Sequence, residues 1–248
     1  MGKTEDTETV LSVDFHTHLL PGMDDGSVSP AESRAMLDAM TADAVEAAVL
    51  TPHFYPDRES PDEFLARREK ALGALLGVLR PSDPRLYVGA EVAYYEGIAA
   101  SCELSKLCIR GTSCLLLELP FDKMFCSTVY RDLEMMINRG LRVVIAHVER
   151  YPACRRKSVR RRLEDMGLIM QSNAEGFINR STARRMHRMW QNGEIDLLGS
   201  DCHHAVRRAP NLGGAVAALQ KRGQTDALRK AFERSRRLLS GAWTLGES

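Results

Sequence analysis

Two histidines and three carboxylates lie in one short stretch near the start of the chain, from Val13 to Gly26. Its sequence is V-D-F-H-T-H-L-L-P-G-M-D-D-G. His16 and His18 are two residues apart, so their side chains point to the same side if a β-strand runs through them. Imidazole and carboxylate groups together bind zinc, manganese or iron. Polar residues of an ordinary loop would look the same, so the rest of the chain has to decide between these interpretations.

The size and charge of the chain narrow the class of protein. Its 248 residues, 44% of them hydrophobic, suit one large α/β domain, expected over residues 11–248. A net charge of +1, from 34 basic and 33 acidic residues, argues against a dedicated nucleic-acid-binding protein. No apolar run approaches the roughly 18–20 residues of a membrane-spanning helix. Residues 1–10 are polar and lack an apolar signal core, so we expect a flexible leader and a cytoplasmic protein with no membrane insertion.

The six cysteines are not arranged as a metal or redox motif. None of them forms a C-x-x-C pair. We therefore expect free thiols in a reducing compartment.

Short apolar runs alternate with helical patterns along the chain. Ser29-Pro30 and Ser60-Pro61 have the residue types that begin helices, with serine as the N-cap and proline in the first turn. Alternating strands and helices predict a parallel sheet covered on both faces. Seven such units favour closure into a barrel, with a doubly wound open sheet as the alternative, although no G-x-G-x-x-G dinucleotide motif is present. The predicted strands are 11–15, 47–50, 85–88, 114–117, 142–146, 168–170 and 195–198. The predicted helices begin at 29 and cover 60–79, 128–139, a segment ending near 166, 181–191, 211–221 and 224–240, with a further short helix within 95–113.

Potential metal ligands follow these strands. Six of the seven histidines lie at such places, and only His187 falls within a predicted helix. In parallel α/β folds the carboxyl ends of the strands build the functional site. The candidates are His16, His18, His53, Glu91, Glu118, His147, Asp201 and His203, together with Asp25.

This set is too large for a single tetrahedral zinc site. It suits two or three metals that share a bridging carboxylate, with manganese, iron and zinc all compatible with nitrogen and oxygen ligands. Adjacent metals activate water and hold both reacting oxygens of a phosphoryl transfer. Arg150 follows a predicted strand end and could bind phosphate oxygens in bidentate fashion. Arg208 could assist, and a solvated surface arginine is an equally good interpretation of that residue.

Taken together, the motifs resemble the polymerase and histidinol phosphatase (PHP) superfamily. They are D-F-H-T-H-L-L-P-G-M-D-D-G, T-P-H-F-Y, G-A-E, L-E-L-P, H-V-E-R-Y, Q-S-N and S-D-C-H. They are most similar to the bacterial protein-tyrosine phosphatase branch encoded with capsular and exopolysaccharide genes, and the resemblance runs from about Asp14 to Arg208. It implies a single PHP-like phosphatase domain, a distorted (βα)7 barrel with its metal site at the C-terminal ends of the strands. It also implies three divalent metal ions as cofactors, commonly manganese (Mn), with Fe or Zn as alternatives.

The resemblance also implies a role for each residue. Arg150 would bind the phosphate with help from Arg208, and Asp14 and Asp24 would orient ligand histidines. His203 is preferred to His204 because the family spacing is S-D-x-H. The implied ligands are His16, His18 and Asp201 for one metal, Glu91 bridging to a second that Glu118 and His147 complete, and Asp25, His53 and His203 for the third.

The implied activity is metal-dependent hydrolysis of phosphotyrosine. The implied partner is the phosphotyrosine-containing tail of a bacterial tyrosine kinase that controls capsule or exopolysaccharide synthesis. One alternative is a phosphatase of histidinol phosphate or another small phosphomonoester. A non-enzymatic, metal-dependent binding module is another.

Two further sequence features have more than one interpretation. Cys202 with Arg208, and Cys154 with Arg160, match the spacing of thiolate phosphatases, but neither loop has the glycine-rich backbone that binds a phosphate. The arginine-rich stretches 155–162 and 180–188 are either solvated helix faces or a docking surface for an acidic or phosphorylated tail.

Overall fold

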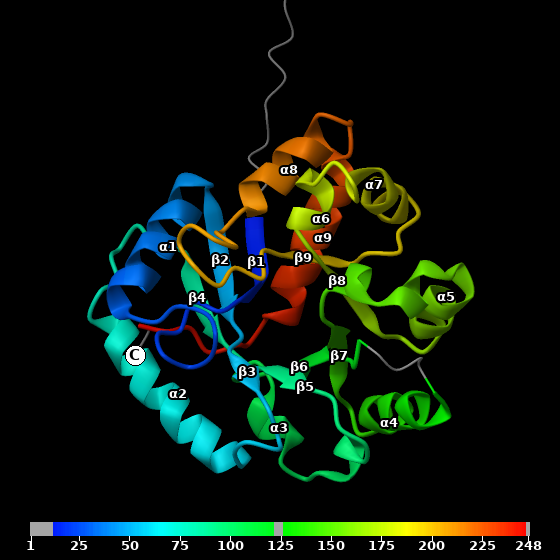
Figure 1. Ribbon diagram of the computed structural model, residues 1–248, viewed down its shortest axis with the longest axis horizontal. Helices are drawn as coiled ribbons and strands as arrows, with labels where there is room; N and C mark the ends of the chain where they lie inside the picture. Colours follow the sequence, from blue (N-terminus) through cyan, green and yellow to red (C-terminus); the bar gives the residue numbers. More distant parts are fainter. Residues whose placement is uncertain (1–11, 122–125, 247–248) are drawn as a thin grey trace, which may run out of the picture.

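The computed structural model describes residues 12–121 and 126–246, so the predicted leader, residues 1–10, lies outside the described part. Short parallel strands form the centre and helices surround them (Figure 1). The strands are β1 (Ser12–Thr17), β2 (Val45–Leu50), β3 (His53–Phe54), β4 (Arg85–Val88), β5 (Glu91–Ala93), β6 (Cys114–Glu118), β7 (Arg142–Ile145), β8 (Ile169–Asn173) and β9 (Leu197–Gly199). The helices are α1 (Pro30–Ala42), α2 (Pro61–Leu76), α3 (Leu104–Leu107), α4 (Ser127–Asn138), α5 (Lys157–Asp165), α6 (Glu175–Ile178), α7 (Ala183–Gln191), α8 (Leu212–Gln220) and α9 (Thr225–Leu238).

The strands form two sheets that together close a barrel. One sheet has the order β1-β2-β4 and the other β3-β5-β6-β7-β8-β9, and every pair of named strands is parallel. β2 and β3 follow each other along one barrel strand that is interrupted at Pro52, and β4 and β5 along another that is interrupted at Gly89-Ala90. We call each such continuous or interrupted strand a strand course. The described residues therefore form seven strand courses rather than nine independent strands.

The barrel closes where the last strand returns to the first. A parallel bridge joins Thr17 to Cys202, and the amide of His18 donates to the Cys202 carbonyl at 2.9 Å. The amide of Asp201 donates to the carbonyl of His16 at 2.8 Å. The predicted barrel is confirmed, and the open doubly wound sheet is excluded because β9 lies beside β1.

Local sequence signals account for the first two long helices. Ser29 caps α1 by accepting from the amide of Glu32, and Pro30 occupies the first turn. Ser60 caps α2 in a reciprocal capping box with Glu63. Both helix starts lie where the sequence predicted them.

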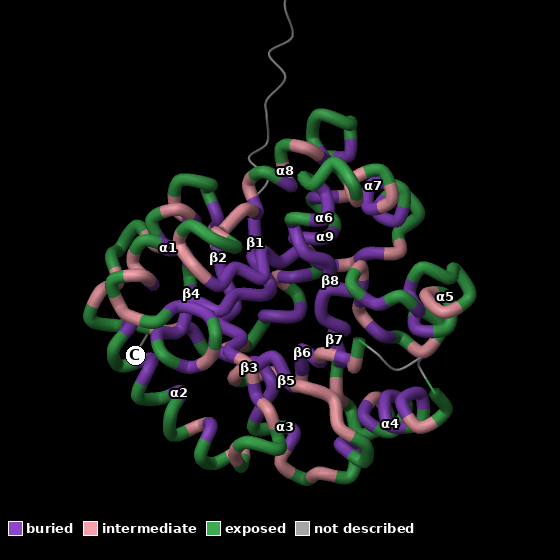
Figure 2. Tube along the Cα trace, in the orientation of Figure 1, coloured by how far each residue is buried: buried purple, intermediate pink, exposed green. Residues whose placement is uncertain are grey.

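The interior of the barrel is apolar except at one end. The strands are buried while the outer faces of the surrounding helices are exposed (Figure 2). Fully buried side chains such as Phe15, Leu50 and Phe232 belong to one continuous core. None of the helices in the described ranges is long and apolar enough to cross a membrane.

Candidate metal centre

A buried group of histidines and carboxylates lies where the strand courses end. Its centre is Glu91, the first residue of β5, which is fully buried. Glu91 Oε2 lies 3.1 Å from His16 Nε2, 3.2 Å from His18 Nε2 and 3.1 Å from His53 Nδ1. Glu91 Oε1 lies 2.9 Å from His147 Nε2. One carboxylate therefore faces four imidazoles, as a bridging ligand would.

The predicted ligands divide into overlapping groups around this carboxylate. In each group, the ligand atoms lie within 4.8 Å of one another. The groups are His16, His18 and Glu91; His53, Glu91 and Glu118; and His18, Asp25, His53 and His203. His147 Nε2 lies 3.3 Å from Glu118 Oε1, which places His147 beside the second group. The structure thus brings these eight residues together from six separate segments of the chain.

One carboxylate oxygen of Asp201 faces the cluster, and the other faces away from it. Its Oδ1 lies 3.4 Å from His18 Nε2 and 3.7 Å from His16 Nε2. Its Oδ2 accepts from Asn173 Nδ2 at 2.7 Å and pairs with Arg208 Nη2 at 2.7 Å. Asp201 therefore connects the candidate metal ligands to a candidate anion-binding arginine.

The backbone is strained where these ligands leave their strands. His147 has a φ of 33° and Asp201 a φ of 53°, both in the left-handed region that favours glycine. Such conformations cost of order 1–3 kcal/mol and persist where the surroundings impose them, often at functional sites. Here the barrel stabilises two non-glycine residues in this conformation so that their side chains enter the cluster.

The donor set fits divalent metal ions. The atoms Glu91 Oε2, His53 Nδ1 and His203 Nε2 are buried and make no hydrogen bond within the described structure. His16 Nε2 and His18 Nε2 face each other at 3.0 Å. Buried polar atoms without partners are costly unless a ligand satisfies them, and imidazole nitrogens with carboxylate oxygens are suitable ligands for manganese, iron or zinc.

The pKa shifts of Glu91, His53 and His203 suit metal binding. Those of His18 and His147 run the other way, because hydrogen bonds to neighbouring carboxylates outweigh burial and raise the His18 pKa well above its usual value and the His147 pKa to about 9. Burial favours the neutral form of Glu91, but the electrostatic attraction of His16 and the hydrogen bond from His147 keep the Glu91 pKa well below its usual range. Burial lowers the pKa of His53, and burial together with His18 lowers the pKa of His203 to about 4. Glu91 is therefore ionised and these two imidazoles are neutral at neutral pH, which is the state that binds a metal.

Asp24 holds two of the candidate ligand histidines in place. Its Oδ2 accepts from His18 Nδ1 at 2.8 Å and from the backbone amide of His53 at 2.8 Å. The proton of His18 is therefore fixed on Nδ1, and its Nε2 is left facing the cluster. Gly26 allows this arrangement, because a Cβ there would lie 2.3 Å from the His18 carbonyl oxygen and 2.9 Å from Asp24 Oδ1.

We expect Asp24→Asn to weaken metal binding roughly 10- to 100-fold, because asparagine orients His18 without the charge that stabilises it. Calorimetric titration with Mn²⁺ measures this affinity. Asp38→Asn is the matched control, since Asp38 pairs with Arg80 on the outer face of α1. Equal Mn²⁺ affinity in both variants would contradict the role given to Asp24.

Two orienting residues lie in the Q-S-N motif, for which the sequence alone predicted no role. Gln171 Oε1 accepts from the backbone amide of His147 at 2.6 Å and lies 3.4 Å from His16 Nδ1. Gln171 Nε2 donates to Asn173 Oδ1 at 3.1 Å, and Asn173 in turn contacts Asp201. Alternation along β8 places both side chains on the barrel interior, which is the signal that could have identified them. Asp14, in contrast, accepts from the backbone amides of His16 and Ser200 rather than from an imidazole ring.

A solvent-accessible cleft adjoins the cluster on the Asp201 side. Arg150 and Arg208 both line it, together with Asn173 and Ser200, and its volume is about 570 Å³. Arg150 Nη1 lies 3.6 Å from Asp201 Oδ2, and both arginine side chains remain 45% exposed. Two half-exposed guanidinium groups beside a buried cluster of histidines and carboxylates form a suitable binding site for a phosphate group.

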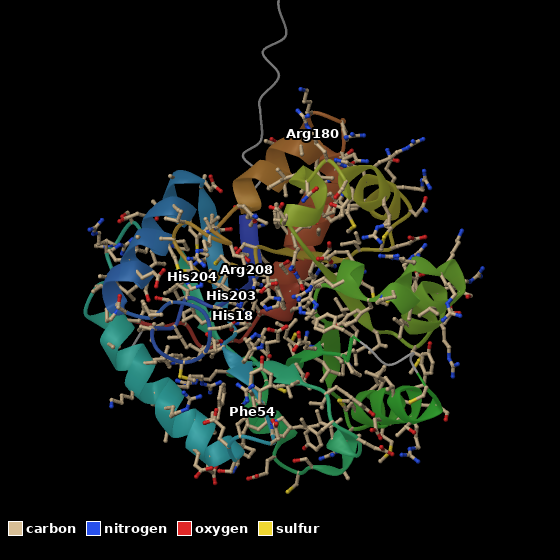
Figure 3. The ribbon with its side chains drawn as sticks, viewed as in Figure 1. His18, Phe54, Arg180, His203, His204 and Arg208 are labelled. Atoms are coloured by element: carbon tan, nitrogen blue, oxygen red, sulfur yellow. The ribbon has the colours of Figure 1, made fainter. Side chains whose placement is uncertain are left out.

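Figure 3 shows His18, His203 and Arg208 close together in the middle of the barrel. His203 belongs to the cluster, whereas His204 lies 3.3 Å from Glu32 Oε1 outside it. This outcome agrees with the preference for His203.

The model of the family described as capsular polysaccharide synthesis, CpsB/CapC, matches residues 12–239. The chain belongs to this family. The match spans every strand of the barrel and all of the candidate ligands, so it confirms the resemblance seen in the sequence motifs.

Relatives of the CpsB/CapC chain include two curated phosphatases. Tyrosine-protein phosphatase YwqE of Bacillus subtilis is 28% identical over 220 residues, covering 84% of each chain. Tyrosine-protein phosphatase CpsB of Streptococcus pneumoniae is 25% identical over 236 residues, covering 89% of this chain and 94% of the relative. A chain from the crystal structures of YwqE and CpsB, described as metal-dependent tyrosine phosphatases, superposes with a TM-score of 0.78 at 23% identity. That superposition covers 93% of this chain and 95% of the other, and it shows a shared fold.

The structure of this CpsB/CapC member argues against thiolate catalysis. Cys202 is fully buried, and burial raises the pKa of its thiol well above the usual value. Burial likewise raises the pKa of Cys154 to about 12. A nucleophilic cysteine needs an accessible thiol with a lowered pKa, so neither residue is suited to that role.

Proposed function

We propose that this protein is a metal-dependent phosphatase that hydrolyses phosphotyrosine in proteins of capsule or exopolysaccharide synthesis. The observation that carries the proposal is the buried cluster around Glu91 next to the cleft of Arg150 and Arg208. Membership of the CpsB/CapC family and the activity named for its relatives YwqE and CpsB support it.

We further propose that the cluster holds three divalent ions, with manganese preferred. His16, His18 and Asp201 would bind one ion, Glu91 would bridge, and Glu118 and His147 would complete the second. Asp25, His53 and His203 would bind the third, and the position of His18 in that group is additional to the expected set. When bound, such ions supply a water activated at neutral pH and neutralise charge on a phosphoryl group.

The residues of the chain bind and orient the substrate. Arg150 and Arg208 donate hydrogen bonds to the phosphate oxygens and stabilise the charge that develops there. Asp201 positions Arg208 through the contact at 2.7 Å. Asp24 accepts a hydrogen bond from Nδ1 of His18, which keeps the proton on that nitrogen and leaves Nε2 facing the cluster. The six cysteines are all free, which supports a site of action in the reducing cytoplasm.

The deciding experiment compares a phosphotyrosyl peptide with histidinol phosphate, using protein stripped by a chelator and then supplied with Mn²⁺. We expect stripping to abolish turnover, Mn²⁺ to restore it, and the phosphotyrosyl peptide to be preferred. Full activity in stripped protein would overturn the metal-dependent mechanism. Preference for histidinol phosphate would favour the small-molecule alternative, and metal binding without turnover of either would favour a binding module.

The partner we propose is the phosphotyrosine-containing tail of a bacterial tyrosine kinase. A basic surface on this protein would attract that tail toward the cleft. We define this surface as the exposed residues Arg155 and Arg161 on the segment after β7 and Arg184 and Arg188 on α7. The segment begins near the cleft, since Arg155 follows Arg150 by five residues. Long-range attraction of this kind raises the rate at which an acidic peptide binds.

Arg160 does not belong to this surface. Its Nε pairs with Glu194 at 2.8 Å and its Nη1 donates to the Cys154 carbonyl at 2.6 Å. Arg160 therefore stabilises the fold, and replacing it would not report on docking.

We expect the double variant Arg155→Glu and Arg161→Glu to lower kcat/KM for the kinase tail roughly 10-fold at low salt. Turnover of a small aryl phosphate should stay unchanged, because that substrate does not reach the basic surface. The control replaces Lys221, the exposed residue that follows α8, and Lys230, an exposed lysine on α9, with glutamate. Equal losses on both substrates, or in both double variants, would refute docking at this surface.

A further inference from the structure

A half-exposed phenylalanine lies against His147 of the candidate metal cluster and against Arg150, which lines the arginine cleft. Phe121 follows β6 by three residues, and 40% of its surface is exposed. Its ring stacks on His147, with centroids 5.6 Å apart at 25°, and on Tyr151, at 5.3 Å and 23°. The Cζ atom of Arg150 lies 4.6 Å from the centroid of the same ring. Phe121 thus contacts a candidate metal ligand and a candidate phosphate-binding residue at once.

The residues beneath Phe121 form a rigid support. Tyr151 and His147 are both buried. The Tyr151 hydroxyl accepts from the backbone amide of Leu119 at 2.9 Å, which ties Tyr151 to the segment that carries Phe121. The phenyl ring is therefore held in a defined position beside Arg150, which lines the cleft.

The position of Phe121 determines what part of a substrate it would meet. In a phosphate monoester, a single oxygen separates phosphorus from the first carbon of the alcohol. A phosphate bound by Arg150 therefore brings that carbon into the neighbourhood of the phenyl ring. An aromatic group gains a stacking interaction with phenylalanine beyond the surface that the two bury, and an alkyl group does not.

We propose that Phe121 is a specificity-determining residue that makes this site select aryl over alkyl phosphate monoesters. The inference rests on the proposed phosphatase function and adds to it the origin of the preference for tyrosine. It concerns one side chain beside Arg150, separate from the candidate metal ligands and from the arginines.

A purely structural role for Phe121 makes a different prediction. Exposed single apolar residues are common, and this one also covers His147 and supports Arg150. If cover and support were its whole role, its loss would weaken the binding of every phosphate-like ligand to the same extent. The ratio between an aryl and an alkyl ligand separates the two roles.

The test measures binding of phenylphosphonate and ethylphosphonate to the Mn²⁺-loaded protein by calorimetry, so that it does not depend on turnover. We expect the wild type to bind phenylphosphonate more tightly and Phe121→Leu to reduce that preference roughly 3- to 10-fold. Phe121→Tyr should retain it, and Met135→Leu, an exposed apolar residue on α4, serves as the control. A preference unchanged in Phe121→Leu, or an equal loss for both ligands, would overturn the inference. A wild type that shows this preference but hydrolyses no phosphate monoester would refute the proposed function and leave the inference intact.

Discussion

Glu91→Gln is expected to lower kcat/KM for a phosphotyrosyl peptide by roughly 10³-fold, because charge stabilisation worth several kcal/mol is lost with the metals. The oxygens of Glu91 face His16, His18, His53 and His147 at 2.9–3.2 Å. Glutamine has nearly the same shape, so packing is retained while the bridging charge is removed.

Metal content gives this prediction a second readout. Elemental analysis of Glu91→Gln should find fewer bound ions than in the wild type, since the proposed bridge serves more than one of them. The control is Glu233→Gln, on the exposed face of α9. Full metal content together with full activity in Glu91→Gln would refute the placement of Glu91 at the centre of the site.

The double variant Arg150→Gln and Arg208→Gln is expected to lower kcat/KM by roughly 10²- to 10³-fold while the metal content stays that of the wild type. Both guanidinium groups line the same cleft and approach the same oxygen of Asp201, so either one could partly replace the other. Removing both takes away the donors that would bind the phosphate, and neither belongs to the cluster of ligand atoms.

The single lysine variants refine this result. Arg150→Lys and Arg208→Lys keep the charge but lose the planar fork, so each should fall between the wild type and the double variant. Lys221→Gln with Lys230→Gln controls for the loss of two positive charges elsewhere. A decrease of less than tenfold in the glutamine double variant would show that the phosphate is bound by other groups.

The sequence predicted the barrel because its signals are local. Buried strands appear as short apolar runs, and the serine–proline pairs at Ser29 and Ser60 specify helix starts through contacts within three residues. Parallel strands joined by helices place all their carboxyl ends at one side, so the candidate ligands were expected to meet there.

Some elements differ from the prediction because tertiary contacts shaped them. β1 continues to Thr17, so His16 lies inside the strand rather than after it. β3 and β5 continue earlier strand courses after Pro52 and after Gly89-Ala90, and they pair with each other across 38 residues, from His53 to Glu91. Helix α6 also went unpredicted, because its four residues are too few to show a helical period.

The sequence alone determined which residues could bind metal and that they would gather at one end of the barrel. The tertiary structure decided how they are arranged: Glu91 at the centre, His203 rather than His204 in the cluster, and Gln171 and Asn173 as orienting residues. It also separated Arg160, held in an ion pair, from the exposed arginines beside it, and it placed Phe121 against Arg150. The physical reason is that residue type and spacing record only local conformation. Which side chains touch depends on contacts that close long loops, such as the one between Asp14 and Ser200, which are 186 positions apart in the sequence.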